Sequence, residues 1–171
     1  MEDLMKNFEK EFEKLKKELK FKATLDELDE AFYLRDYISK EGYISSHPIK
    51  QISRRIIDFF GSWIQYLHGM LMANPSSLIS MAEVQAFDEE DKAKANKLMD
   101  KMMIFSTRYN IFILNSDKKE AQLFIDESFA FWKKELSPAL EDFMKKEKKL
   151  WQERLDSKPQ KKDKNKDSLY G

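Results

Sequence analysis

Apolar side chains recur at every third or fourth position along most of the chain, and this spacing is what most constrains its fold. The N-terminal segment shows it clearly, with steps of three and four residues between Met5, Phe8, Phe12, Leu15 and Leu19. Such a period places the apolar residues on one face of an α-helix. We therefore expect an amphipathic helix within residues 1–22.

Glycine and proline are scarce, with four of each among 171 residues. Tight hairpin turns need residues that accept a positive φ, so this composition disfavours an all-β sandwich or barrel. An apolar fraction of 42 % is sufficient for a buried core in a chain of this length. We predict an all-α fold, a single compact bundle of six to seven helices over residues 1–156, with the 1–22 helix as a semi-independent part.

Capping residues indicate where the first two internal helices begin and end. Thr24 followed by Glu27 has the spacing of a capping box, and Gly42 is a natural C-terminal cap, so one helix is expected over residues 25–41. Pro48 suits a first helical turn, with Ser46 as its cap. The helix that follows has a broad apolar arc, and we expect it to be the hub of the core.

The second half of the chain contains four further helix signals. Asn74 and Pro75 end the hub helix and begin a short helix that reaches about residue 87. Asp88 is the next cap, and Asp117 with Glu120 repeats the capping-box spacing. The final helix is expected to begin at Ser137–Pro138 and to end at Leu155.

The composition changes after residue 156. Residues 157–171 contain two apolar side chains and a run of lysines. Such a segment buries too little apolar surface to offset the entropy of ordering it. We predict a disordered, lysine-rich basic tail over residues 157–171.

The residue types exclude several chemistries. The chain has no cysteine, which removes disulfides, zinc–thiolate sites and iron–sulfur clusters, and neither His47 nor His68 lies in a metal-binding motif. The four glycines are too scattered for a phosphate-binding loop. We therefore expect no cofactor, no metal and no catalytic residue. The charged N-terminal residues are unlike a signal peptide, which predicts a cytoplasmic location.

A polar stripe on the hub helix is the first candidate binding site. Steps of three and four residues place most of its members on one helix face, with a second glycine beside them: Arg54, Asp58, Gly61, Gln65, His68, Gly69 and Met72. Glycines within a helix cost about 1 kcal/mol relative to alanine but allow another backbone to approach closely. The stripe is therefore either a face for a partner or ligand, or the wet side of an amphipathic helix.

The second candidate is a basic surface near the C-terminus. Residues 144–171 contain ten Lys/Arg and five Asp/Glu, although the net charge of the chain is zero. The lysines proposed to contact nucleic acid are Lys145, Lys146, Lys148, Lys149, Lys158, Lys161, Lys162, Lys164 and Lys166. The alternative is a solubilising surface, since lysine lacks the bidentate geometry of arginine.

These features favour binding over catalysis. The leading hypothesis is a non-catalytic helical interaction or scaffold protein that binds another protein or itself, because the aromatic and methionine residues exceed what a small bundle hides easily. The alternatives are an accessory nucleic-acid-binding subunit of a nucleoprotein complex, and a small-molecule binder or enzyme that uses the polar stripe. A membrane partner is unlikely, since Asp58 lies inside the most apolar helix.

Overall fold

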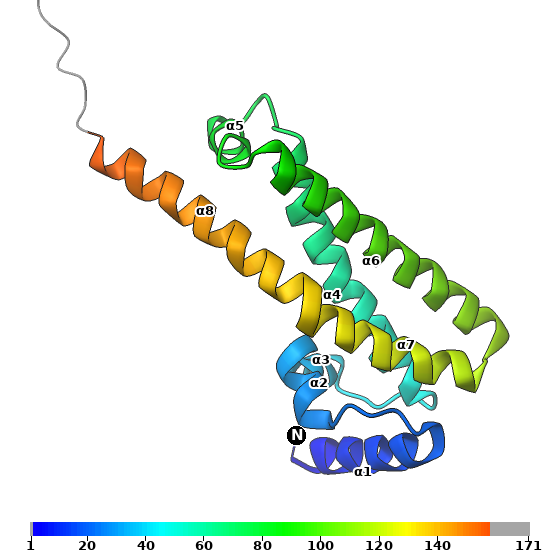
Figure 1. Ribbon diagram of the computed structural model, residues 1–171. Coiled ribbons are helices and arrows are strands. Elements are labelled where there is room, and N and C mark those ends of the chain that lie inside the picture. The colour runs from blue at the N-terminus through cyan, green and yellow to red at the C-terminus, as the bar shows by residue number, and fades with distance from the viewer. Residues whose placement is uncertain (1, 158–171) are drawn as a thin grey trace, which may run out of the picture.

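The computed structural model describes residues 2–157, and these residues are helical throughout apart from short connections. The elements are α1 (Glu2–Leu19), α2 (Leu25–Phe32), α3 (Leu34–Glu41), α4 (Pro48–Leu71), α5 (Leu78–Val84), α6 (Glu89–Asn115), α7 (Lys118–Phe131), the π-helical turn η1 (Trp132–Leu136) and α8 (Ser137–Asp156). The elements α7, η1 and α8 are continuous and form one long rod (Figure 1). Counted with α1 to α6, this part of the chain has seven helical rods. The all-α bundle predicted from the sequence is confirmed. The predicted tail lies outside the described residues except for Ser157.

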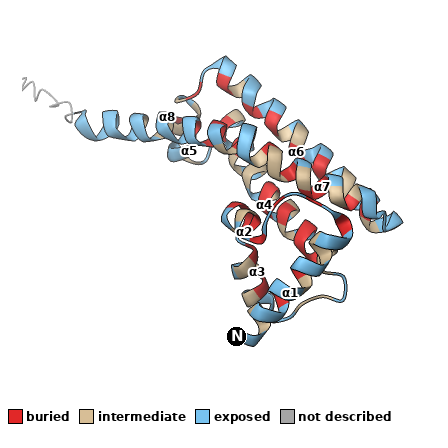
Figure 2. Ribbon diagram, turned by 60° about the horizontal axis from the view of Figure 1, so that its bottom comes forward, coloured by how far each residue is buried: buried red, intermediate tan, exposed pale blue. Residues whose placement is uncertain are grey.

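The hub of the core is α4, as its broad apolar arc predicts. The helix pairs most extensively with α6 and also contacts α1, α2, α3, α5 and α7. Ile52, Ile56, Phe60 and Leu67 on α4 are essentially inaccessible to solvent. Figure 2 shows the buried residues following the inward faces of the helices around α4.

The N-terminal helix α1 packs against its own chain. Phe8 and Phe12 are completely buried, and Phe12 meets Phe21 edge to face. The segment after α1 is fixed by a hydrogen bond from the Lys22 backbone N–H to the Asp126 Oδ1 atom of α7, at 2.8 Å. The apolar face of α1 is therefore covered within the chain, while its division from residues 25–156 as a semi-independent part stays a prediction.

Three of the predicted N-terminal caps are present, as is the C-terminal cap at Gly42. Thr24 and Glu27 form the reciprocal capping box, and Asp88 forms one with Asp91. Asp117 accepts hydrogen bonds from the backbone N–H groups of Lys119 and Glu120. The Glu120 side chain does not complete a box, because its carboxylate binds Arg108 of α6 at 2.7 Å instead.

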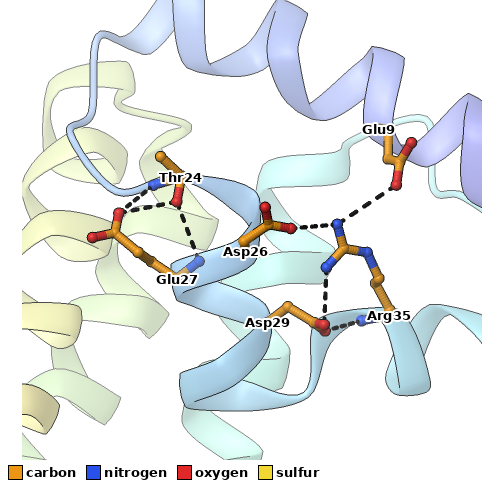
Figure 3. A network of polar contacts seen from close by, with 6 residues as sticks. All are labelled: Glu9, Thr24, Asp26, Glu27, Asp29 and Arg35. Atoms are coloured by element: carbon orange, nitrogen blue, oxygen red, sulfur yellow. Dashed lines mark hydrogen bonds and ion pairs between the residues drawn. The ribbon is translucent and has the colours of Figure 1, made fainter.

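The prediction of a single helix over residues 25–41 is wrong, because the segment forms two helices. Tyr33 adopts a left-handed conformation, with φ 56° and ψ 50°, and divides the segment into α2 and α3. Ion pairs between Arg35 and three carboxylates stabilise the break. Arg35 binds Asp26 at 2.7 Å and Asp29 at 3.0 Å, and it approaches Glu9 of α1 at 3.5 Å (Figure 3). Neither glycine nor proline marks the break, so the sequence pattern gave no sign of it.

Two other helix starts differ from the prediction. The N-cap of α4 is His47 rather than Ser46, and no side chain caps this end. The short helix α5 begins after Ser77, whose hydroxyl accepts a hydrogen bond from the Ser80 backbone N–H, so it starts three residues after Pro75.

The predicted helix start at Ser137–Pro138 coincides with the first residues of α8, but α8 is not separated from α7 by a loop. Phe131, Trp132, Leu136 and Ser137 all have right-handed helical dihedrals, so the chain passes from α7 into α8 without a loop. A proline inside an α-helix loses one hydrogen bond and its ring crowds the carbonyl group four residues earlier. The helix widens into the π-turn η1 just before this position, and it accommodates Pro138 without ending.

Candidate functional site

A groove between α4 and the η1–α8 segment is the strongest candidate binding site. It is an open hollow of about 420 Å³, which we call the tryptophan groove. Its lining residues are Trp63, Trp132, Ser137, Leu140, Glu141, Met144, Lys145 and Lys148. Trp63 comes from α4, and Trp132 is the first residue of the π-turn. Isolated π-turns within α-helices occur frequently at functional sites.

The floor of the groove rests on a rigid aromatic cluster. The Trp132 ring meets the Phe59 ring edge to face, with centroids 4.9 Å apart, and lies 6.4 Å from the Trp63 ring. Phe59 is buried, whereas both tryptophans are only half-buried. The cluster therefore fixes the two indoles from behind and leaves part of each open to a partner.

One buried polar atom on the α4 side of this region is unsatisfied. The indole nitrogen of Trp63 has no hydrogen-bond partner among the described residues, whereas the neighbouring Tyr66 hydroxyl lies near the Glu147 carboxyl of α8. Burying such a group without a partner costs about 1–3 kcal/mol. The packing beside the groove is thus not optimised for stability, which is a common property of binding sites.

Leu140 and Met144 form the apolar part of the α8 wall of the groove, and they begin an apolar stripe that continues along α8 beyond the groove. Leu140, Met144, Trp151 and Leu155 follow one another in steps of four, seven and four residues, so they share one helix face. Exposure is 3 % for Leu140, 42 % for Met144, 37 % for Trp151 and 84 % for Leu155, so the stripe is most exposed at its C-terminal end. Figures 1 and 2 show why, because the distal half of α8 leaves the body of the bundle.

The rim of the groove is polar and carries one unpaired cation. Lys145 binds Glu141 at 2.6 Å, and this hydrogen bond, with the lysine charge, lowers the pKa of the Glu141 carboxyl. The same contact raises the pKa of Lys145. Lys148 forms no ion pair with any residue that the structure describes. It therefore remains available to a carboxylate of a partner.

The sequence did not single out this groove. The two indoles and the apolar residues of α8 have the spacing of core positions, and their partial exposure depends on the π-turn and on the departure of α8 from the bundle. The only sequence signal for the groove was the spacing of the apolar residues of α8, whose steps of four and seven residues place them on one helix face. Seven aromatic and methionine residues of two helices are interface candidates from the sequence. Phe124, Phe131 and Met102 belong to the core, Phe129, Trp132 and Met99 are half-buried, and Met103 is exposed.

The predicted polar stripe lies on the outer side of α4. Its members are exposed except Gly61, which is half-buried, and Arg54 approaches Asp58 at 3.8 Å in a solvated ion pair. A Cβ atom built on Gly61 or Gly69 would meet no heavy atom within 4 Å. No element of the described chain therefore uses the close approach that these glycines allow, and the role of the stripe as a partner face stays a prediction.

The α8 lysines of the predicted basic surface are mostly neutralised by acidic groups of the chain. Lys146 binds Asp91 at 2.5 Å, Lys145 binds Glu141, and Lys149 approaches Glu153 at 3.7 Å. The five lysines from Lys158 to Lys166 lie outside the described residues. A nucleic-acid contact would have to compete with these ion pairs, and it stays a prediction.

A second hollow is lined by His47, the histidine that does not belong to the polar stripe. His47 lines a space of about 350 Å³ between α1, α4 and the α6–α7 turn. Glu18 and Lys118 bind one another in this hollow, and this contact lowers the pKa of the Glu18 carboxyl. Lys50 also lines the hollow, where its Nζ atom donates to the Ile113 carbonyl oxygen at 3.5 Å and forms no ion pair within residues 2–157. Unlike the tryptophan groove, the hollow is lined by no tryptophan.

Neither a metal centre nor a membrane-spanning helix is found within residues 2–157. No group of three or more His, Asp or Glu side chains in this range is placed to hold a metal ion. None of the helices there combines the length and the apolar character needed to cross a membrane. The comparisons with known proteins find no matching family model, no similar curated protein and no similar solved structure.

Proposed function

We propose that this chain is a non-catalytic helical interaction protein that binds an amphipathic helix of a partner protein in the tryptophan groove. The observation that carries the proposal is the pair of half-buried indoles, Trp63 and Trp132, at the floor of an open apolar groove. Tryptophan is enriched among the residues that contribute most binding energy at protein interfaces. Rigid aromatic residues also lose little conformational entropy when they are covered.

The shape and chemistry of the groove favour a helix as the ligand. Its apolar residues run along α8, and an amphipathic helix laid beside them presents side chains at matching three- and four-residue intervals. Met144 adds a flexible, polarizable side chain that adapts to different shapes. Lys148 at the rim favours a carboxylate on the flank of the partner helix, since the cation is otherwise unpaired.

A peptide-display selection tests the proposal. The library consists of helical peptides with apolar residues at i, i+3, i+4 and i+7 and acidic residues on the flanks, and the full chain is the target. We expect selected peptides to bind the wild type, to bind Met144→Glu at least tenfold more weakly, and to bind Met103→Glu as well as the wild type. Met103 is a matched control because it is also an exposed methionine, but it lies on α6.

A second readout locates the bound peptide. The chain has three tryptophans, and two of them line the groove, so the indole N–H signals in a nitrogen-15 NMR spectrum report on it directly. Binding in the groove should shift the signals of Trp63 and Trp132. Failure to select any peptide, or equal binding by Met144→Glu and the wild type, would contradict the proposal.

A further inference from the structure

A second apolar surface lies on the far side of the bundle, along the C-terminal half of α6. Ile104, Ile111 and Leu114 are 59 %, 49 % and 83 % exposed, and Thr107 lies between them on the same face. The steps of three, four and three residues are those of the seam by which one helix packs against another. We call these four residues the α6 seam. In Figure 2 exposed residues follow the outer side of α6.

The α6 seam lies in a stretch that is almost free of charge. Residues 102–116 contain one charged side chain, Arg108, in a chain with 62 Lys, Arg, Asp and Glu among its 171 residues (31 basic plus 31 acidic). Arg108 is already bound by Glu120 and Glu127 of α7. A partner that covered the seam would therefore gain no ion pair along its middle, and any charge it placed there would be desolvated without compensation.

Charged side chains flank both ends of the seam. Asp100 lies one step before Ile104 on the same helix face, with Lys97 one step further away, and Lys119 lies just beyond Leu114, near Asp117 at the start of α7. Asp100 and Lys119 are exposed, and neither forms an ion pair among residues 2–157. An unpaired carboxylate therefore flanks one end of the apolar seam, and an unpaired ammonium group flanks the other end.

This order of charges selects the partner. We infer that the α6 seam binds the same seam of a second copy of this chain, with the two α6 helices antiparallel about a two-fold axis. In that arrangement Ile104 of one copy meets Leu114 of the other and Thr107 meets Ile111. Asp100 then approaches the end that carries Lys119 of the other copy. A parallel pair would place Asp100 beside Asp100 and Lys97 beside Lys97, which like charges disfavour.

The dimer leaves the tryptophan groove free, because the groove is built from α4, η1 and α8 and the seam from α6. The two surfaces are therefore separable by mutation. The chain as a dimer would present two grooves, one from each copy, and so would bind a partner with two helices more tightly than either groove alone.

Analytical ultracentrifugation over a range of concentrations tests the inference. The wild type should show a mass twice that of the 20.4 kDa chain at high concentration. Ile104→Glu and Leu114→Glu should each weaken dimerisation at least tenfold, while Met144→Glu should leave it unchanged. Both seam residues are exposed, so the variants are expected to fold, which circular dichroism verifies. A wild type that stays monomeric, or seam variants that dimerise normally, would overturn the inference.

Engineered thiols test the orientation, since the chain has no cysteine of its own. In the antiparallel pair, the two copies of residue 104 are separated by ten helical residues, or about 15 Å, which no disulfide spans. A mixture of Ile104→Cys and Leu114→Cys chains should cross-link between the two variants on oxidation, whereas Ile104→Cys alone should not. Rapid cross-linking of Ile104→Cys with itself would overturn the antiparallel arrangement.

Discussion

Asp29 binds both the backbone and the side chain of Arg35 across the break between α2 and α3. Its Oδ1 atom accepts a hydrogen bond from the Arg35 backbone N–H at 2.7 Å, and its Oδ2 atom accepts one from Nη1 at 3.0 Å (Figure 3). The last residue of α2 is held from the other side, where Arg55 of α4 donates from Nε to the carbonyl oxygen of Phe32 at 2.6 Å. Tyr33 is thus fixed in its left-handed conformation by contacts on both sides.

The break at Tyr33 makes a prediction that inverts the usual order of helix propensities. In a helix interior glycine is about 1 kcal/mol less favourable than alanine, whereas a left-handed residue with a Cβ atom costs about 1–2 kcal/mol. We therefore expect Tyr33→Gly to be more stable than Tyr33→Ala by about 1 kcal/mol, as measured by urea unfolding. Both variants lose the same ring, so the comparison isolates the backbone. A more stable alanine variant would mean that residues 25–41 form one helix.

The ion pair between Lys146 and Asp91 makes a second prediction. Asp91 is a buried residue in the first turn of α6, and Lys146 of α8 binds its Oδ2 atom at 2.5 Å. Lys146→Met should leave the Asp91 carboxylate with fewer hydrogen-bond partners and should therefore lower the free energy of unfolding. Lys148→Met is the matched control, since this nearby lysine has no ion pair in the described chain, and its stability should stay within about 0.5 kcal/mol of the wild type.

The same two variants separate a structural role from nucleic-acid binding. If the α8 lysines serve the fold, Lys146→Met and Lys148→Met differ in stability, and neither changes affinity for nonspecific RNA or DNA at low salt. If they contact phosphates, each substitution should weaken binding similarly and reduce its salt dependence by about one ion. A salt titration of RNA binding with both variants measures this difference.

The helices and most of their ends could be predicted because their signals are local. The capping box at Thr24 and Glu27 depends on residues three positions apart, and the left-handed cap at Gly42 depends on one residue. The break at Tyr33 could not be predicted in this way, because it is stabilised by Asp29 and by Arg55 from a different helix. Tertiary contacts there override the local preference for a continuous helix.

The candidate site was predicted less completely than the fold for the same reason. The spacing of Leu140 and Met144 shows that they share a face, but which face the bundle covers depends on the direction in which α8 leaves η1. Exposure of Trp63 and Trp132 is likewise a property of three elements that meet in space. The polar stripe of α4 was recognisable from periodicity alone, and periodicity does not distinguish a wet face from a docking face.

The environment of Glu147 makes a prediction about pH. Partial burial on α8, and the negative charge of Glu83, raise the pKa of this carboxyl above its ordinary value of 4.5, although the nearby Tyr66 hydroxyl opposes the shift. The folded protein therefore holds this proton more tightly than the unfolded chain does. The contribution of Glu147 to stability is thus most favourable below pH 4.5 and is lost as the pH rises through the raised pKa.

Glu147→Gln should remove this pH-dependent loss. We expect the variant to be more stable than the wild type at pH 7, by less than about 1 kcal/mol because the carboxyl is partly solvated, and to match it near pH 4. Glu13→Gln serves as the control, since Glu13 is exposed and forms no ion pair within residues 2–157, and its stability should follow the wild type at both pH values. Urea unfolding at pH 4 and pH 7 decides between the outcomes. A Glu147→Gln protein that is less stable at pH 7 would show that the ionised carboxylate stabilises the contact between α8 and Tyr66.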